Sequence, residues 1–115
     1  MSYDIELCYE DVQAEVKNHQ EGGTYQVGGT KKASLNLTYN YSWFYHRFLD
    51  DGEGIRWMYG KTGKETISRL ADAVEELGVK QYKDYWAPTP GNAGYALSIL
   101  LEWAKQHPTA VWDGD

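Results

Sequence analysis

The sequence predicts an α+β domain in which N-terminal antiparallel β-hairpins, about four strands in all, are followed by three or four helices packed on one face of the sheet. Two patterns lead to this prediction. Apolar and polar residues alternate through much of residues 1–41, which is the period of half-buried strands. From residue 42 onward apolar residues recur every three or four positions, as in a helix. A length of 115 residues fits a single domain, with residues 42–107 mainly helical and 108–115 as a C-terminal tail.

The strands are expected within the first 41 residues. Residues 3–8 and 12–17 both alternate apolar and polar side chains across a short connection, so we expect an antiparallel hairpin. Residues 24–27 are a short third strand and residues 34–39 a fourth. The pair Gly28-Gly29 between them suits a tight turn, because glycine adopts positive φ without steric cost. A glycine pair can also cradle a phosphate, but no P-loop pattern surrounds this one, and the turn is favoured.

The first helix is expected to begin at Asn40 or Ser42, because either side chain can cap it. Phe44 and Phe48 lie four residues apart and therefore share a face of this helix. The turn at residues 50–52 ends it with a glycine. A short helical turn follows before Gly60.

The second and third helices have clearer ends. Thr62 and Glu65 have the spacing of a capping box, and Gly78 suits the left-handed residue that closes a helix. Thr89 is a good N-cap for the third helix, and Pro90 fits its first position. These four signals place both helices within a residue or two.

The third helix is apolar nearly all round, so we expect it at the centre of the domain, ending at about His107. The tail after it is expected to pack through Val111 and Trp112. Gly91 and Gly94, in the first turns of the third helix, call for an explanation, because glycine costs about 1 kcal/mol in a helix relative to alanine. Either another part of the chain or a ligand must approach them closely, and close packing of this helix on Tyr39 or Tyr59 is favoured.

Composition and charge exclude several classes of function. The formal net charge is −6, and residues 1–21 carry six acidic residues against one lysine, so no basic face for direct nucleic-acid binding is expected. The single cysteine, Cys8, rules out an internal disulfide and a cysteine-based zinc site. No signal peptide or membrane span is recognised, which predicts a cytoplasmic protein.

The aromatic content points to a binding surface or to a ring-filled core. Five Trp and ten Tyr stand against two Phe, so most rings carry a polar atom that needs a partner. No catalytic motif is present, the three histidines have no metal-ligand spacing, and no cofactor is expected. We therefore predict no catalytic residues and no metal site.

Polar and aromatic groups gather at the approaches to the helices. Helix N-termini expose free N–H groups and a partial positive charge, which together favour anions. For Asn40 and Asn92 a plain capping role is the competing interpretation. The candidate ligand-binding residues are Tyr39, Asn40, Tyr41, Arg56, Tyr59, Lys61, Trp86, Thr89 and Asn92.

Several blocks of the sequence, "TYNYS", "GIRWMYG", "TPGNAGYAL" and "WAKQHP", resemble a family of small proteins of phages, prophages and related bacterial genomes. The resemblance runs from about Glu21 to the end of the chain. It implies the cytoplasm of a bacterial host and, for small acidic proteins of this kind, binding or inhibition of a host factor. It supplies no catalytic residues.

Three functions follow as hypotheses. The leading one is a non-enzymatic binding protein for a host protein or a small anionic ligand, held in a hollow shared by Asn40, Tyr59 and Asn92. The first alternative is a homodimer or other assembly that buries Trp43 or Trp57. The second is an unrecognised enzyme, in which a carboxylate of residue 84 or 102 would meet the cation of residue 56 or 61 in a cleft.

Overall fold

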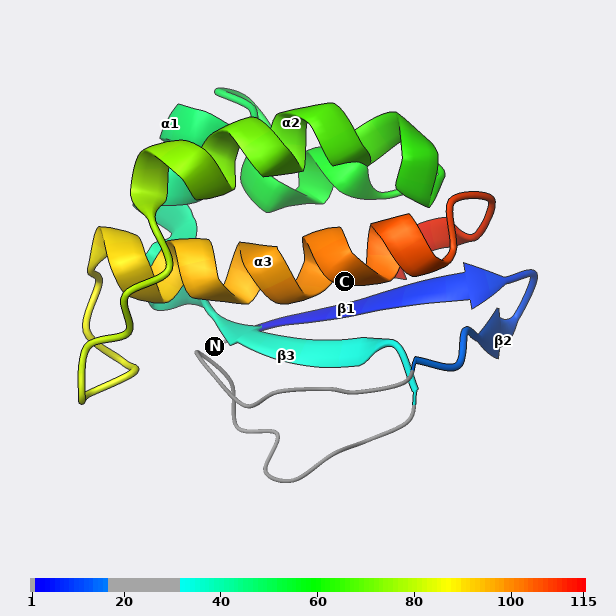
Figure 1. Cartoon of the computed structure of the whole chain (residues 1–115), viewed down its shortest axis with the longest axis horizontal. Helices are drawn as coiled ribbons and strands as arrows, with labels where there is room; N and C mark the ends of the chain where they lie inside the picture. The colour runs from blue at the N-terminus through cyan, green and yellow to red at the C-terminus, as the bar shows by residue number, and fades with distance from the viewer. Residues whose placement is uncertain (1, 17–31) are drawn as a thin grey trace.

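The computed structural model describes residues 2–16 and 32–115 and confirms the α+β class, with a four-stranded antiparallel sheet and three α-helices (Figure 1). Two short 3₁₀ helices, η1 and η2, flank the first α-helix. The elements are β1 Ser2–Tyr9, β2 Val12–Gln13, β3 Ser34–Thr38, η1 Tyr39–Tyr41, α1 Ser42–Phe48, η2 Gly54–Met58, α2 Gly63–Leu77, α3 Pro90–Gln106 and β4 Val111–Gly114.

The sheet is built around β1, which pairs antiparallel with each of the other strands. Ile5 lies opposite Leu35 of β3, and Leu7 lies opposite Trp112 of β4. The predicted C-terminal tail therefore contains the fourth strand, which the sequence analysis did not identify. Its four residues VWDG include an acid and a glycine, and they form a strand because Trp112 is buried and the backbone pairs with β1.

The second strand is shorter than predicted. It stops at Gln13 because the backbone then changes partner: the Ala33 N–H donates to the Ala14 carbonyl at 2.9 Å, and the Leu7 N–H donates to the Ala33 carbonyl at 3.1 Å. The strand predicted at residues 24–27 and the turn at residues 28–29 lie outside the described residues.

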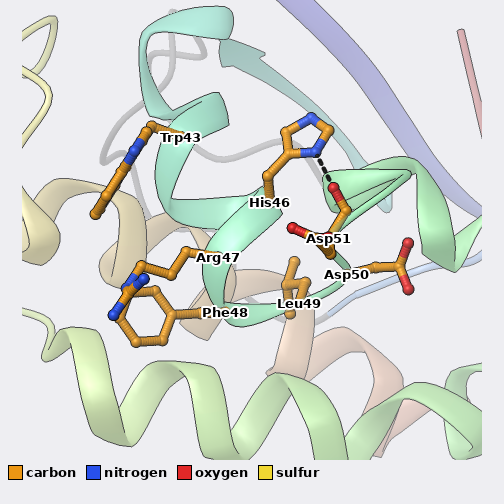
Figure 2. Close-up of a pocket in the computed structure, with 7 residues that line it drawn as sticks. All are labelled: Trp43, His46, Arg47, Phe48, Leu49, Asp50 and Asp51. Carbon is orange, nitrogen blue, oxygen red and sulfur yellow. Dashed lines mark hydrogen bonds between the residues drawn. The ribbon is translucent and has the colours of Figure 1, made fainter.

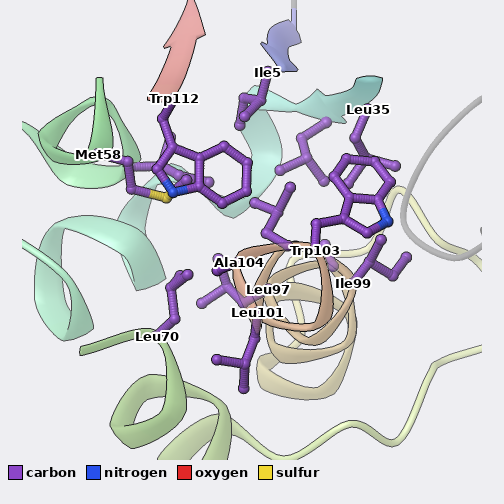
Figure 3. Close-up of a cluster of buried hydrophobic side chains, with 14 of the residues drawn as sticks. Ile5, Leu35, Met58, Leu70, Leu97, Ile99, Leu101, Trp103, Ala104 and Trp112 are labelled. Carbon is purple, nitrogen blue, oxygen red and sulfur yellow. The ribbon is translucent and has the colours of Figure 1, made fainter. Parts of the chain in front are cut away.

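Helix α3 lies between the sheet and α2, as expected for a helix that is apolar nearly all round (Figures 1 and 3). Figure 3 shows Trp103 of α3 on the side of Leu35, and Leu70 of α2 on the opposite side of α3. The sheet and α2 are also joined directly, because the Trp112 indole N–H donates to Thr66 Oγ1 at 2.9 Å with both side chains buried.

The predicted ends of the two long helices are confirmed. Thr62 and Glu65 form a capping box at the start of α2, and Gly78 closes it with a φ of +78°. Thr89 caps α3, with Pro90 as its first residue. Helix α1 begins at Ser42, one of the two predicted starts, but the predicted capping role was wrong: η1 precedes the helix, and among the described residues no side chain caps α1. None of the helices in the described ranges is long and apolar enough to cross a bilayer.

Candidate functional site

Three of the nine predicted site residues, Asn40, Tyr41 and Asn92, hold the segment between α2 and α3, here called the 79–89 loop. Asn92 is the main anchor, and its side chain is buried. Its Oδ1 accepts from the Tyr82 N–H at 2.8 Å, and its Nδ2 donates to the Asp84 and Ala87 carbonyls, each at 3.0 Å. Asn92 is therefore neither a cap nor a free ligand-binding group.

Helix η1 supplies two further anchors to the same loop. Asn40 Nδ2 donates to the Trp86 carbonyl at 2.9 Å, and the buried Tyr41 hydroxyl donates to the Tyr85 carbonyl. Burial and the nearby Asp84 raise the pKa of Tyr41, so the phenol keeps its proton for this bond. The Tyr85 and Trp86 rings stack with centroids 4.6 Å apart. Three side chains from η1 and α3 thus fix a backbone segment that has no regular secondary structure.

The glycines at the start of α3 are explained by the same loop. A Cβ at Gly91 would overlap the Lys80 carbonyl oxygen, and one at Gly94 would overlap that of Gly78. Close packing was predicted, but against tyrosine rings; the structure shows the backbone after α2 instead. Thr89 Oγ1 accepts from the Asn92 N–H at 3.2 Å and acts as an ordinary N-cap.

A second group forms around Arg56, away from the 79–89 loop. The guanidinium lies 4.9 Å from the ring centroid of Tyr3 and donates to the Tyr39 hydroxyl at 3.0 Å and to the Asp115 carbonyl at 2.7 Å. The hydroxyl of Tyr59 is buried and makes no hydrogen bond within the described residues, and desolvation raises its pKa. Asn40 and Asn92 therefore both bind the 79–89 loop, whereas Tyr59 lies near Arg56.

Lys61 lies apart from both groups. Its ammonium donates to the Trp57 carbonyl at 3.0 Å and lies 5.3 Å from the Trp57 ring centroid. No ion pair within the described residues joins Asp84 or Glu102 to Lys61 or Arg56, so the contact that the enzyme hypothesis requires is not observed. In the same residues no three His, Cys, Asp or Glu side chains are grouped to hold a metal ion.

A different surface lies on α1 (Figure 2), and of its residues the sequence had marked only Trp43, as a ring that a homodimer would bury. An open hollow of about 340 Å³ is bordered by residues that we call the α1 surface: Trp43, His46, Arg47, Phe48, Leu49, Asp50 and Asp51. Trp43 is 64% exposed, which is unusual for so large an apolar ring. The Arg47 guanidinium lies 5.7 Å from the Trp43 centroid and 5.8 Å from that of Phe48.

The α1 surface has a cationic aromatic side and an acidic side. Figure 2 shows Trp43, Arg47 and Phe48 together on one side, with His46, Asp50 and Asp51 on the other. Asp50 is partly neutralised, because it lies 3.8 Å from the Arg69 guanidinium and accepts from the Glu53 N–H at 2.8 Å. The ring of His46 is fixed by a 2.9 Å hydrogen bond between Nδ1 and the Asp51 carbonyl.

One feature of the sequence pointed to this surface. Trp43 and Arg47 are four residues apart, on the face of α1 opposite to the buried Tyr45 and Leu49. A tryptophan on the outward face of a helix contributes little to the core, so its ring is left on the surface of α1 beside Arg47.

Comparison of the chain with protein-family models, with curated proteins and with solved structures finds no match. The resemblance to phage and prophage proteins therefore stays a prediction. The function proposed below is inferred from the geometry of the described residues.

Proposed function

We propose that the protein is a non-enzymatic binding protein that captures a partner protein through the α1 surface. The observation that carries this proposal is the exposure of Trp43, at 64%, beside an open hollow. Burying such a ring against a partner yields on the order of 2–3 kcal/mol from the hydrophobic effect alone. Tryptophan and arginine are also the residue types that most often dominate the binding energy of protein interfaces.

The α1 surface is held ready for binding. The Trp43 ring packs edge-on against Phe44 with centroids 5.1 Å apart. The Arg47 guanidinium contacts the same ring. Side chains that are already ordered lose less conformational entropy when a partner binds. We therefore assign the recognition role to Trp43 and Arg47.

A small anionic ligand at the predicted site has less support. The side-chain groups of Asn40, Tyr41 and Asn92 that would hold it already bind the 79–89 loop. The phage setting suggested by the sequence blocks makes a bacterial host protein in the cytoplasm the partner that we favour. A second copy of the chain is the alternative occupant of the α1 surface, and the measured mass in solution separates the two.

The test is capture of partners from a bacterial host lysate by the immobilised protein, compared with a Trp43→Ala variant. The matched control is Tyr82→Ala, because Tyr82 is 54% exposed on a different surface. We expect Trp43→Ala to lose the captured protein while Tyr82→Ala retains it. Both variants should unfold within about 0.5 kcal/mol of the parent, as surface substitutions do. Equal capture by both variants would overturn the proposal, and a dimer that Trp43→Ala dissociates would favour self-association.

A further inference from the structure

We infer that the α1 surface recognises a carboxylate, which Arg47 receives, next to an apolar group that covers Trp43. This inference rests on the proposed function, because it names the chemistry of the partner at the same surface. The partner segment is therefore one that places an aspartate, a glutamate or a terminal carboxylate beside an apolar side chain.

Within the described residues, Arg47 is the arginine that donates no hydrogen bond. Arg56 donates to the Tyr39 hydroxyl and to the Asp115 carbonyl, and Arg69 donates to the Leu49 carbonyl and lies beside Asp50. Within the described residues Arg47 has ring contacts but neither a hydrogen bond nor an ion pair. Its donors are consequently available to an incoming group.

The stack on aromatic rings makes Arg47 suited to a planar anion. A guanidinium held against a ring keeps its N–H donors in the plane, and that fork matches the two oxygens of a carboxylate. Arg47 and Trp43 are both exposed, so the partner itself has to cover them; once it does, the bond to Arg47 is shielded from water and is stronger than in open water.

The charges around the hollow set the direction of binding. Asp50 is already paired with Arg69 and with the Glu53 N–H, which leaves Asp51 as the uncompensated acid of the α1 surface. A carboxylate of the partner is repelled from Asp51 and attracted to Arg47 on the other side. Polar and charged side chains make up most of the border of the hollow, so the apolar part of the partner is placed on the exposed ring of Trp43.

The test is an NMR titration of the isotope-labelled full chain with 3-phenylpropionate, and with 3-phenylpropionamide as the uncharged match. We expect the acid to shift the Trp43 indole and Arg47 Nε–H signals in a saturable way, with an affinity about fivefold above that of the amide. In Arg47→Gln the two probes should bind equally. Arg56→Gln is the control, and it should keep the preference for the acid.

Equal affinity for the two probes in the parent protein, or no shift of either signal up to tens of millimolar, would overturn the carboxylate inference. The proposed function fails separately. If Trp43→Ala loses the captured partner while Arg47→Gln retains it, the proposed partner binding is supported and carboxylate recognition by Arg47 is contradicted. If the acid is preferred but Trp43→Ala captures normally, the carboxylate site stands and the partner function falls.

Discussion

At the scale of single residues, Gly94 has an unfavourable helix propensity that close packing of the backbone outweighs. Alanine is favoured over glycine in a helix by about 1 kcal/mol, so the sequence alone marks this position as unfavourable. In the structure α3 approaches the chain after α2 so closely that a Cβ would overlap the Gly78 carbonyl oxygen and lie 2.9 Å from the Leu77 Cβ. Backbone atoms cannot move aside cheaply, so the position requires glycine.

We therefore expect Gly94→Ala to lower the free energy of unfolding by about 2–4 kcal/mol, despite the better helix propensity of alanine. Urea unfolding followed by circular dichroism measures this change. The control is Gly52→Ala, where the nearest atom to the added Cβ is 3.7 Å away, and its effect should stay within about 0.5 kcal/mol. A stabilised Gly94→Ala variant would show that α3 and the C-terminal end of α2 are not in this contact.

At the scale of elements, the 79–89 loop depends on Asn92 for its conformation. One buried amide serves as acceptor for one N–H and as donor for two carbonyls, and this combination is what only asparagine or glutamine can provide. An aspartate at this position would keep the acceptor but set a carboxylate oxygen against the carbonyls of Asp84 and Ala87.

We expect Asn92→Asp to cost at least about 3 kcal/mol of unfolding free energy at neutral pH. The new carboxyl is buried against two acceptors, so its pKa in the folded state should lie above that in the unfolded state. The folded variant therefore binds the proton more tightly, and its deficit should shrink as pH falls from the raised folded-state pKa to the ordinary carboxyl pKa, and stay constant below it. Asn40→Asp is the control: its amide is exposed and loses one bond, so a cost below about 1 kcal/mol is expected. Equal costs for both variants would contradict an anchoring role for Asn92.

At the scale of the whole molecule, buried tyrosine phenols and the Cys8 thiol determine how stability changes at alkaline pH. Tyr41 and Tyr45 are fully buried, and desolvation raises the pKa of both, as it does for Tyr59. Burial also raises the pKa of the Cys8 thiol, from 9.0 to about 11. The folded protein thus holds protons that the unfolded chain releases, and stability should be complete below about pH 9 and fall as pH rises above it.

The measurement compares tyrosinate absorbance with circular dichroism during an alkaline titration. Exposed phenols should ionise first, and the buried ones should ionise together with the loss of helical signal. Tyr59→Phe removes a buried hydroxyl that has no hydrogen-bond partner within the described residues, so it should not lower stability at pH 7 and should move alkaline unfolding to higher pH. Ionisation of all ten tyrosines without loss of structure would contradict this account.

The sequence by itself determined the fold class, both ends of α2 and α3, and the central place of α3. These features depend on residue types within a few positions of one another, such as the Thr62–Glu65 capping box and the Thr89-Pro90 start. Only the tertiary structure decided that the C-terminal tail is a strand, because β4 exists through its pairing with β1 more than a hundred residues earlier.

For the candidate site as well, the sequence predicted some features and the tertiary structure decided others. Sequence patterns identified Asn40, Tyr41 and Asn92 as polar groups in unusual positions, but the loop that they hold comes from a part of the chain that only folding brings to η1. Trp43 could be recognised as a ring on the outward face of α1, whereas the hollow beside it required the turn after α1 to fold back. Local order follows from near neighbours in the chain, whereas the contacts that hold the 79–89 loop join segments distant in the sequence, which pattern alone does not specify.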